Sequence, residues 1–113
     1  MTRQASLGEF EQLLLLAVLR LGVEAFGARI GAELEHKAGR RVSRGALYSS
    51  LDRLERKGFV TWEVEAPTPE RGGHPARRFT LTRVGLDALR EHQRAYRELA
   101  AGLEDVLEGG ATG

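Results

Sequence analysis

The chain has 113 residues, no cysteine and a formal net charge of +1. That length predicts a single domain with a modest core, and the lack of cysteine excludes disulfides, thiolate metal sites and thiol catalysis. The longest apolar run, Leu13 to Leu19, is too short to cross a bilayer, and the N-terminus has acids where a signal peptide needs an apolar core, so we expect a cytoplasmic protein with no membrane partner.

Charge is segregated along the chain. Residues 40–58 hold six basic and two acidic side chains, residues 71–83 hold four arginines and no acid, and residues 84–113 hold six acids against three arginines. Such segregation favours a basic face for a polyanion and a separate acidic end. The alternative is that each charged segment is ordinary solvated surface.

The first helix is predicted to begin at Ser6, because a serine followed three residues later by a glutamate, here Glu9, is a capping-box pattern. Apolar residues between Leu7 and Leu21 occupy nearly every side of this helix. We therefore expect it to be buried on more than one side, against its own core and against a second subunit. Gly22 is its predicted end.

A second helix is predicted over about residues 27–38, with Ile30 and Leu34 facing inward. Gly27 and Gly31 weaken this helix intrinsically, so their expected use is close packing against a neighbouring helix.

The third helix is predicted between Ser43 as N-cap and Gly58 as the glycine that ends it. It has an apolar stripe and an opposite face that is polar and basic. The stripe is formed by Leu47, Leu51 and Leu54, and the outer face by Gly45, Ser49, Asp52, Arg53 and Arg56, with Arg44 and Tyr48 on its flank. Short helices in this order, the third one basic outside, predict a helix-turn-helix.

A β-hairpin is predicted next. Val60, Trp62 and Val64 alternate onto one side of a first strand, and residues 76–82 return as a second strand. Proline and glycine between the strands indicate a long tip that is not strand. Helices followed by a hairpin with an Arg/Gly tip have the order of a winged helix, in which the third helix enters the major groove and the hairpin follows the phosphate backbone.

A last helix is predicted from the cap Thr82 to about Leu107. Its apolar residues repeat at heptad spacing and form a seam of Leu89, Tyr96, Leu99, Leu103 and Val106, with His92 in the matching place after Leu89. The seam predicts a C2 dimer, although part of it could pack on its own domain. The expected fold is mainly α with a small β-hairpin: a winged helix-turn-helix over residues 6–81, a C-terminal dimerisation helix over 82–108 and a disordered tail over 109–113.

The blocks ALYSSLDRLERKGFV (residues 46–60) and ERGGHPARRFTLTRVGLDAL (residues 70–89) resemble the PadR family of bacterial transcriptional regulators. The opening LGEFEQLLLLAVLRLG is similar to the first helix of one branch of that family. The resemblance implies a homodimeric winged-helix repressor that binds pseudo-palindromic operators in double-stranded DNA, with an effector left open. Some members bind drugs between tryptophans at the dimer centre, whereas the only tryptophan here, Trp62, falls in a wing strand.

Carried over by the resemblance, the DNA-binding candidates are Ser43, Arg44, Tyr48, Ser49 and Arg53 in the third helix and Arg71, Gly72, His74, Arg77 and Arg78 in the wing. Two of them have open alternatives. Tyr48 contacts the DNA backbone or packs its helix on the core. Arg77 shares a strand face with Phe79 and Leu81, so it contacts phosphate or turns inward.

No catalytic or cofactor motif is found. The three histidines are too scattered for a metal site, and the chain has no nucleotide-binding glycine motif. We therefore expect neither an enzyme nor a cofactor. The alternative function from another class is a winged helix that serves as a protein-interaction module without direct DNA readout. Salt dependence separates the two, because phosphate contacts weaken steeply with salt.

Overall fold

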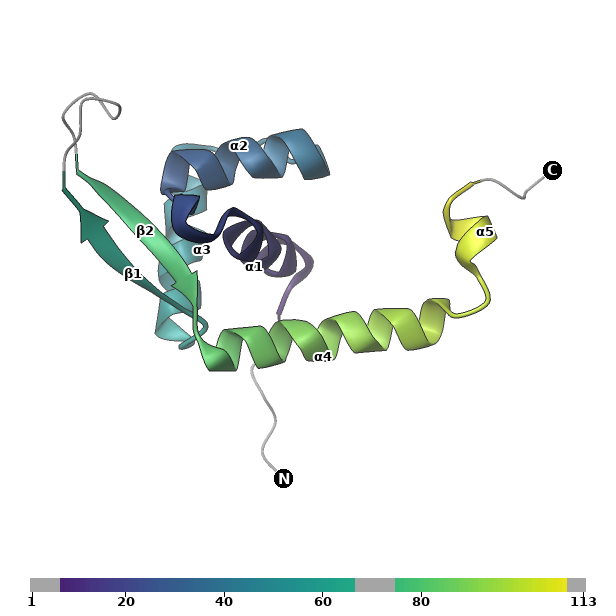
Figure 1. Ribbon diagram of the computed structural model, residues 1–113. Helices are drawn as coiled ribbons and strands as arrows, with labels where there is room; N and C mark the ends of the chain where they lie inside the picture. Colours follow the sequence, from purple (N-terminus) through teal and green to yellow (C-terminus); the bar gives the residue numbers. More distant parts are fainter. Residues whose placement is uncertain (1–6, 67–74, 110–113) are drawn as a thin grey trace.

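The computed structural model describes residues 7–66 and 75–109. Its elements follow in the order α1 (Glu9–Leu21), the 3-10 helix η1 (Gly22–Glu24), α2 (Gly27–Ala38), α3 (Arg44–Arg56), β1 (Val60–Glu65), β2 (Ala76–Leu81), α4 (Arg83–Ala100) and α5 (Glu104–Leu107). The expected class, mainly helical with an antiparallel hairpin, is confirmed. The hairpin lies beside α3 at one end of the molecule, and α4 passes α1 and projects beyond it (Figure 1).

The ends of α2 and α3 follow the local signals in the sequence. The hydroxyl of Ser43 accepts a hydrogen bond from the Ala46 N–H at 3.1 Å and so caps α3. Gly39 and Gly58 follow the two helices with φ of 65° and 80°, a left-handed conformation that favours glycine because it has no Cβ. The predicted boundaries of both helices are therefore confirmed.

The predicted start of α1 is wrong. The helix begins at Glu9, where Gly8 is the N-cap and its N–H donates to the Glu11 carboxylate at 3.0 Å. The capping glutamate is thus Glu11 rather than Glu9, and Ser6 lies outside the described residues. Gly22 ends the helix as expected.

The core lies where α1, α2 and α3 meet the inner face of the hairpin. Its largest fully buried side chains are Phe79, Leu14, Leu15, Ile30, Leu51, Leu54, Val18 and Val60. The predicted inward residues of α2 and α3 all belong to this cluster. The apolar stripes thus set how the helices pack, and the opposite face of α3 is left towards solvent.

The hairpin is anchored to the rest of the fold along β2. Val60 pairs with Leu81 and Trp62 with Phe79 in an antiparallel register. The Phe79 N–H donates to the Ala25 carbonyl at 2.9 Å, which ties β2 to the segment before α2. Trp62 is half-buried against the core, as its place in the strand predicts. Val64 is 60 % exposed, because it lies beyond the part of the strand that the helices cover.

A close contact joins the hairpin to α4. Thr82 caps α4 by accepting from the Gly85 N–H at 3.0 Å, and its hydroxyl donates to the Gly58 carbonyl at 2.6 Å. A Cβ on Gly85 would lie 2.1 Å from the carbonyl oxygen of Phe59. The first turn of α4 therefore packs directly on the backbone between α3 and β1, and this position requires glycine.

The last helix is shorter than predicted. It ends at Ala100, Gly102 has φ of 85°, and α5 begins at Glu104. The glycine in left-handed conformation interrupts the helix, so Leu103 and Val106 do not continue the heptad pattern of α4. Within residues 7–66 and 75–109, every helix is too short or too polar to span a membrane.

Candidate nucleic-acid interface

The outer face of α3 presents polar and basic side chains to solvent. Arg44, Ser49 and Arg56 are exposed, and within the described residues neither arginine forms an ion pair. A Cβ on Gly45 would meet no atom within 4 Å, so this position is also open. We call Arg44, Gly45, Ser49 and Arg56 the free positions of α3. Donors and cations that are not engaged inside the protein are available for phosphates or base edges.

The hairpin-side flank of α3 is tied to the sheet. An Arg77 terminal nitrogen lies 3.0 Å from a carboxylate oxygen of Asp52, and its guanidinium carbon lies 4.1 Å from the centroid of the Trp62 ring. The same carbon is 5.5 Å from the centroid of the Tyr48 ring and 5.0 Å from that of Phe79. Of the two placements left open for Arg77, the structure has the inward one.

The opposite flank of α3 is tied to α1 through Glu11. Both carboxylate oxygens of Glu11 lie 3.0 Å from the Lys57 ammonium, and one lies 3.5 Å from Arg53. Arg53 also donates to the Ser50 hydroxyl at 3.3 Å. Its side chain is still 48 % exposed, so Arg53 combines a structural contact with access to solvent.

The charge of Glu11 is stabilised by these partners. Burial by itself raises the pKa of a carboxyl group. The Gly8 N–H, the Lys57 ammonium and the Arg53 guanidinium outweigh burial, and the pKa of Glu11 is lowered from its ordinary value of 4.5. The carboxylate therefore stays ionised and holds the C-terminal end of α3 to the start of α1.

Tyr48 packs in a tight space between α2 and the hairpin. A Cβ on Gly27 would lie 1.9 Å from the Tyr48 hydroxyl oxygen, so glycine at the start of α2 makes room for the ring. The Tyr48 and Phe79 ring centroids are 6.4 Å apart, and the Arg44 guanidinium lies 5.4 Å from the Tyr48 ring. Tyr48 is half-buried, so one side of it packs on the core and the other remains near the exposed face. By contrast, a Cβ on Gly31 would only make an ordinary contact of 3.5 Å with Leu47.

Of the remaining wing candidates, only Arg78 lies within the described residues. Arg78 lies on the outer face of the sheet, where its terminal nitrogen is 3.2 Å from Glu63 and 3.3 Å from Glu65. Arg71, Gly72 and His74 lie outside the described residues.

Two residues of this surface are missing from the candidates carried over by resemblance. Arg56 lies on the outer face with Ser49, and the helical wheel places it there. Asp52 is the partner of Arg77, and no local signal in the sequence predicts that pairing. In the ranges 7–66 and 75–109, no group of three or more metal-ligating side chains could hold a metal ion.

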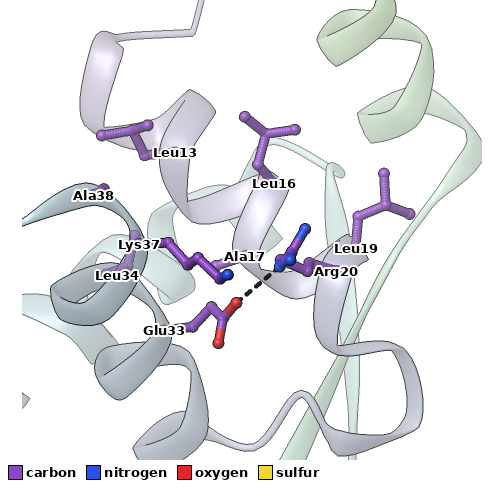
Figure 2. Close-up of a pocket in the computed structure, with 9 residues that line it drawn as sticks. All are labelled: Leu13, Leu16, Ala17, Leu19, Arg20, Glu33, Leu34, Lys37 and Ala38. Atoms are coloured by element: carbon purple, nitrogen blue, oxygen red, sulfur yellow. Dashed lines mark hydrogen bonds and ion pairs between the residues drawn. The ribbon is translucent and has the colours of Figure 1, made fainter.

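An apolar groove lies on another side of the molecule, between α1 and α2. It has a volume of about 510 Å³ and is lined by Leu13, Leu16, Ala17, Leu19, Arg20, Glu33, Leu34, Lys37 and Ala38. Figure 2 shows the leucines along α1 and the ion pair of Arg20 with Glu33, at 2.9 Å, across the groove. Leu16 and Leu19 are 37 % and 50 % exposed, so this apolar surface is uncovered in the single chain.

Comparison with known proteins gives a consistent result. The "Transcriptional regulator PadR-like family" matches residues 15–91. The transcriptional regulator Rv3488 of Mycobacterium tuberculosis is 38 % identical over 86 residues, which cover 76 % of this chain and 73 % of that protein. The crystal structure of a PadR family regulator from Eggerthella lenta has a TM-score of 0.62 at 27 % identity, covering 87 % of this chain and 83 % of that one.

A PadR-like regulator from Bacillus cereus has a TM-score of 0.65 over 86 % of this chain and 92 % of its own, at 19 % identity. At that identity it supports the fold alone.

Proposed function

The chain belongs to the PadR-like family of transcriptional regulators and is a DNA-binding transcription regulator, and from this premise we propose that it is a cytoplasmic homodimeric repressor of a pseudo-palindromic operator. Transcriptional regulators of this kind are not enzymes. The observation that carries the proposal is the outer face of α3, where Arg44 and Arg56 are exposed and unpaired within the described residues, beside the hairpin.

In this proposal α3 enters the major groove and the hairpin follows the adjacent phosphate backbone. Base and phosphate contacts come from the N-cap and outer face of α3, namely Ser43, Arg44, Tyr48, Ser49, Arg53 and Arg56. Arg78 is kept as a wing candidate from the sequence alone, because its side chain is only 26 % exposed and paired with Glu63 and Glu65, and it would have to leave both carboxylates to reach a phosphate. Arg71, Gly72 and His74 are proposed as further wing contacts from the sequence.

The test begins with a duplex selected by the protein from random DNA. Arg44→Ala and Arg56→Ala should each weaken binding to this duplex, and loss of one phosphate contact should reduce the slope of log affinity against log salt by about 0.9. Arg90→Ala is the control, because Arg90 is an exposed arginine on α4 rather than on α3 or the hairpin. If both α3 variants bind like the protein with native sequence, α3 is not the reading element.

The homodimer is proposed from apolar surface that the single chain leaves uncovered. Tyr96 and Leu99 on the projecting half of α4 are 57 % and 82 % exposed, and Leu103 and Val106 beyond it are 48 % and 58 % exposed. Leu89 is only 3 % exposed and packs in its own core, so the proposed interface begins after it. The groove between α1 and α2 offers a second apolar surface, and a C2 pair can bury both.

Sedimentation of the full chain tests the dimer. Leu99→Glu should shift the protein towards monomer without loss of stability of the single chain, because Leu99 is 82 % exposed there. Arg97→Glu places the same charge on the opposite side of α4 and should leave the dimer intact. A chain with native sequence that stays monomeric at about 50 μM, a concentration at which even weak dimers form, would exclude the homodimer while leaving DNA binding by α3 open.

A further inference from the structure

Arg77 is enclosed by aromatic rings and a carboxylate from different elements. Its guanidinium carbon lies 4.1 Å from the centroid of Trp62 on β1, 5.0 Å from that of Phe79 on β2 and 5.5 Å from that of Tyr48 on α3. A terminal nitrogen lies 3.0 Å from Asp52 on α3. All three ring distances are within the range of about 6 Å at which cations and aromatic rings attract one another.

These contacts already engage the guanidinium group through which an arginine would bind DNA. The side chain of Arg77 is only 27 % exposed, and its Nε is buried without a hydrogen-bond partner within the described residues. One terminal nitrogen is engaged with a carboxylate, whose negative charge offsets that of the guanidinium. To reach a phosphate with its full charge, Arg77 would have to leave both the rings and Asp52.

We propose that Arg77 is a positioning residue that fixes the hairpin to α3 through Asp52 and Tyr48, rather than a contact to DNA. The register supports this role, because Arg77 and Phe79 lie on the same face of β2 and that face meets α3. The planar guanidinium can stack on rings and bind a carboxylate at once, which the point charge of lysine cannot do equally well. The inference rests on the proposed function, in which α3 and the hairpin bind one duplex together.

Removal of the Asp52 charge has opposite expected effects for the two possible roles of Arg77. The Asp52 side chain is 45 % exposed on the hairpin-side flank of α3, where a carboxylate repels an approaching phosphate backbone. If Arg77 served mainly to contact DNA, removal of the Asp52 charge would release the arginine and tighten binding. If Arg77 positions the hairpin through Asp52, removal of that charge weakens binding to the selected duplex although the protein becomes more positive.

The experiment measures binding of labelled duplexes to Asp52→Asn and Arg77→Lys at a temperature where thermal melting shows every variant folded. One duplex is selected by the protein from random DNA and the other is unrelated in sequence. We expect each variant to bind the selected duplex about 5- to 20-fold more weakly, the range expected for coupling between neighbouring residues, and the double variant to lose little more than either single one. Binding to the unrelated duplex depends mainly on charge. It should change by less than about twofold in Arg77→Lys, which keeps the positive charge, and should tighten in Asp52→Asn, which loses a negative one.

Asp87→Asn is a closely matched control. Asp87 is also paired with an arginine, at 3.2 Å from Arg83, and its side chain is 46 % exposed, against 45 % for Asp52. It lies on α4 rather than on α3 or the hairpin, and its replacement should leave affinity for the selected duplex within about twofold. Trp62 is the only tryptophan in the chain, so its fluorescence reports the stack directly and should change in Arg77→Lys but not in Asp87→Asn.

Asp52→Asn binding as tightly as the native sequence or more tightly would overturn the proposal, and so would full affinity or unchanged Trp62 fluorescence in Arg77→Lys. Arg44→Ala separates this failure from failure of the proposed function. If Arg44→Ala weakens binding while Asp52→Asn does not, α3 reads DNA and the positioning role is wrong. If neither variant matters, α3 does not bind the duplex and both proposals fail.

Discussion

Replacement of Gly27 by alanine should destabilise the protein although alanine is the better helix former. A Cβ at this position would lie 1.9 Å from the Tyr48 hydroxyl oxygen and 2.5 Å from Cζ of the same ring. Favourable contacts between heavy atoms begin at about 3.5 Å, so the ring must move by more than an ångström or α2 must shift. Overpacking of this kind costs about 1–3 kcal/mol, and the gain in helix propensity offsets at most about 1 kcal/mol of it.

Gly31 offers a control within the same helix, one turn later. A Cβ there would lie 3.5 Å from Leu47, which is an ordinary contact. Gly31→Ala should therefore stabilise the protein by about 0.5–1 kcal/mol. Urea unfolding followed by circular dichroism should give opposite signs for the two glycine-to-alanine changes.

Tyr48→Leu provides the decisive background, because leucine lacks the two atoms that a Cβ on Gly27 would strike. In that background Gly27→Ala should become neutral or stabilising. Equal destabilisation with and without the tyrosine ring would refute this reasoning, and so would a Gly27→Ala protein as stable as Gly31→Ala.

Three further changes test the contacts that hold α3 and α4. Because the pKa of Glu11 is lowered from 4.5 in the folded protein, its contribution to stability is complete above that pH and is lost as the pH falls below it. The free energy of unfolding, measured between about pH 2 and 6, should therefore fall more steeply with decreasing pH for the native sequence than for Glu11→Gln. Gly85→Ala should cost about 3 kcal/mol or more, since its Cβ would lie 2.1 Å from the backbone oxygen of Phe59, and a melting temperature equal to that of the native sequence would contradict the contact. Thr82→Val removes the cap of α4 and the hydrogen bond to Gly58 and should cost about 1–2 kcal/mol in thermal unfolding, whereas Thr82→Ser should retain most of the stability.

The sequence predicts the helical elements well where a local signal marks their ends. Ser43 and Gly58 bound α3 because capping depends on a few neighbouring residues. The last helix shows the limit of such reasoning. The heptad spacing favours a helix through Leu107, but Gly102 adopts a left-handed conformation and ends the pattern early. The capping-box pattern likewise predicts a start of α1 at Ser6, whereas the helix begins at Glu9 with Gly8 as its N-cap.

Local signals in the sequence could not predict which charged side chains at the site are paired with one another. Arg77 pairs with a carboxylate 25 positions away, and Lys57 with one 46 positions away. Such pairs arise only after the helices and the hairpin have packed, so composition alone overstates the number of cations available to DNA. Arg44 and Arg56 remain exposed and unpaired within the described part of the chain because the carboxylates that satisfy Arg53 and Arg77 lie on the two flanks of α3.

Some residues of α3 contact other elements of the fold, whereas the free positions form no ion pair with the described residues. This difference determines where the DNA preference of such a regulator can be changed. Tyr48, Asp52 and Arg53 contribute to the packing of the fold, so changing them alters stability and DNA preference together. Among the free positions, in the part of the chain that the structure describes, only Arg44 contacts a packed ring, that of Tyr48 at 5.4 Å, and Gly45 has open space for a side chain that it does not now have. We therefore expect substitutions at Gly45, Ser49 and Arg56 to change operator preference with little change in stability, whereas a change at Arg44 also removes its contact with Tyr48. A library randomised at Gly45, Ser49 and Arg56 alone explores different operators with the packing of the fold left unaltered.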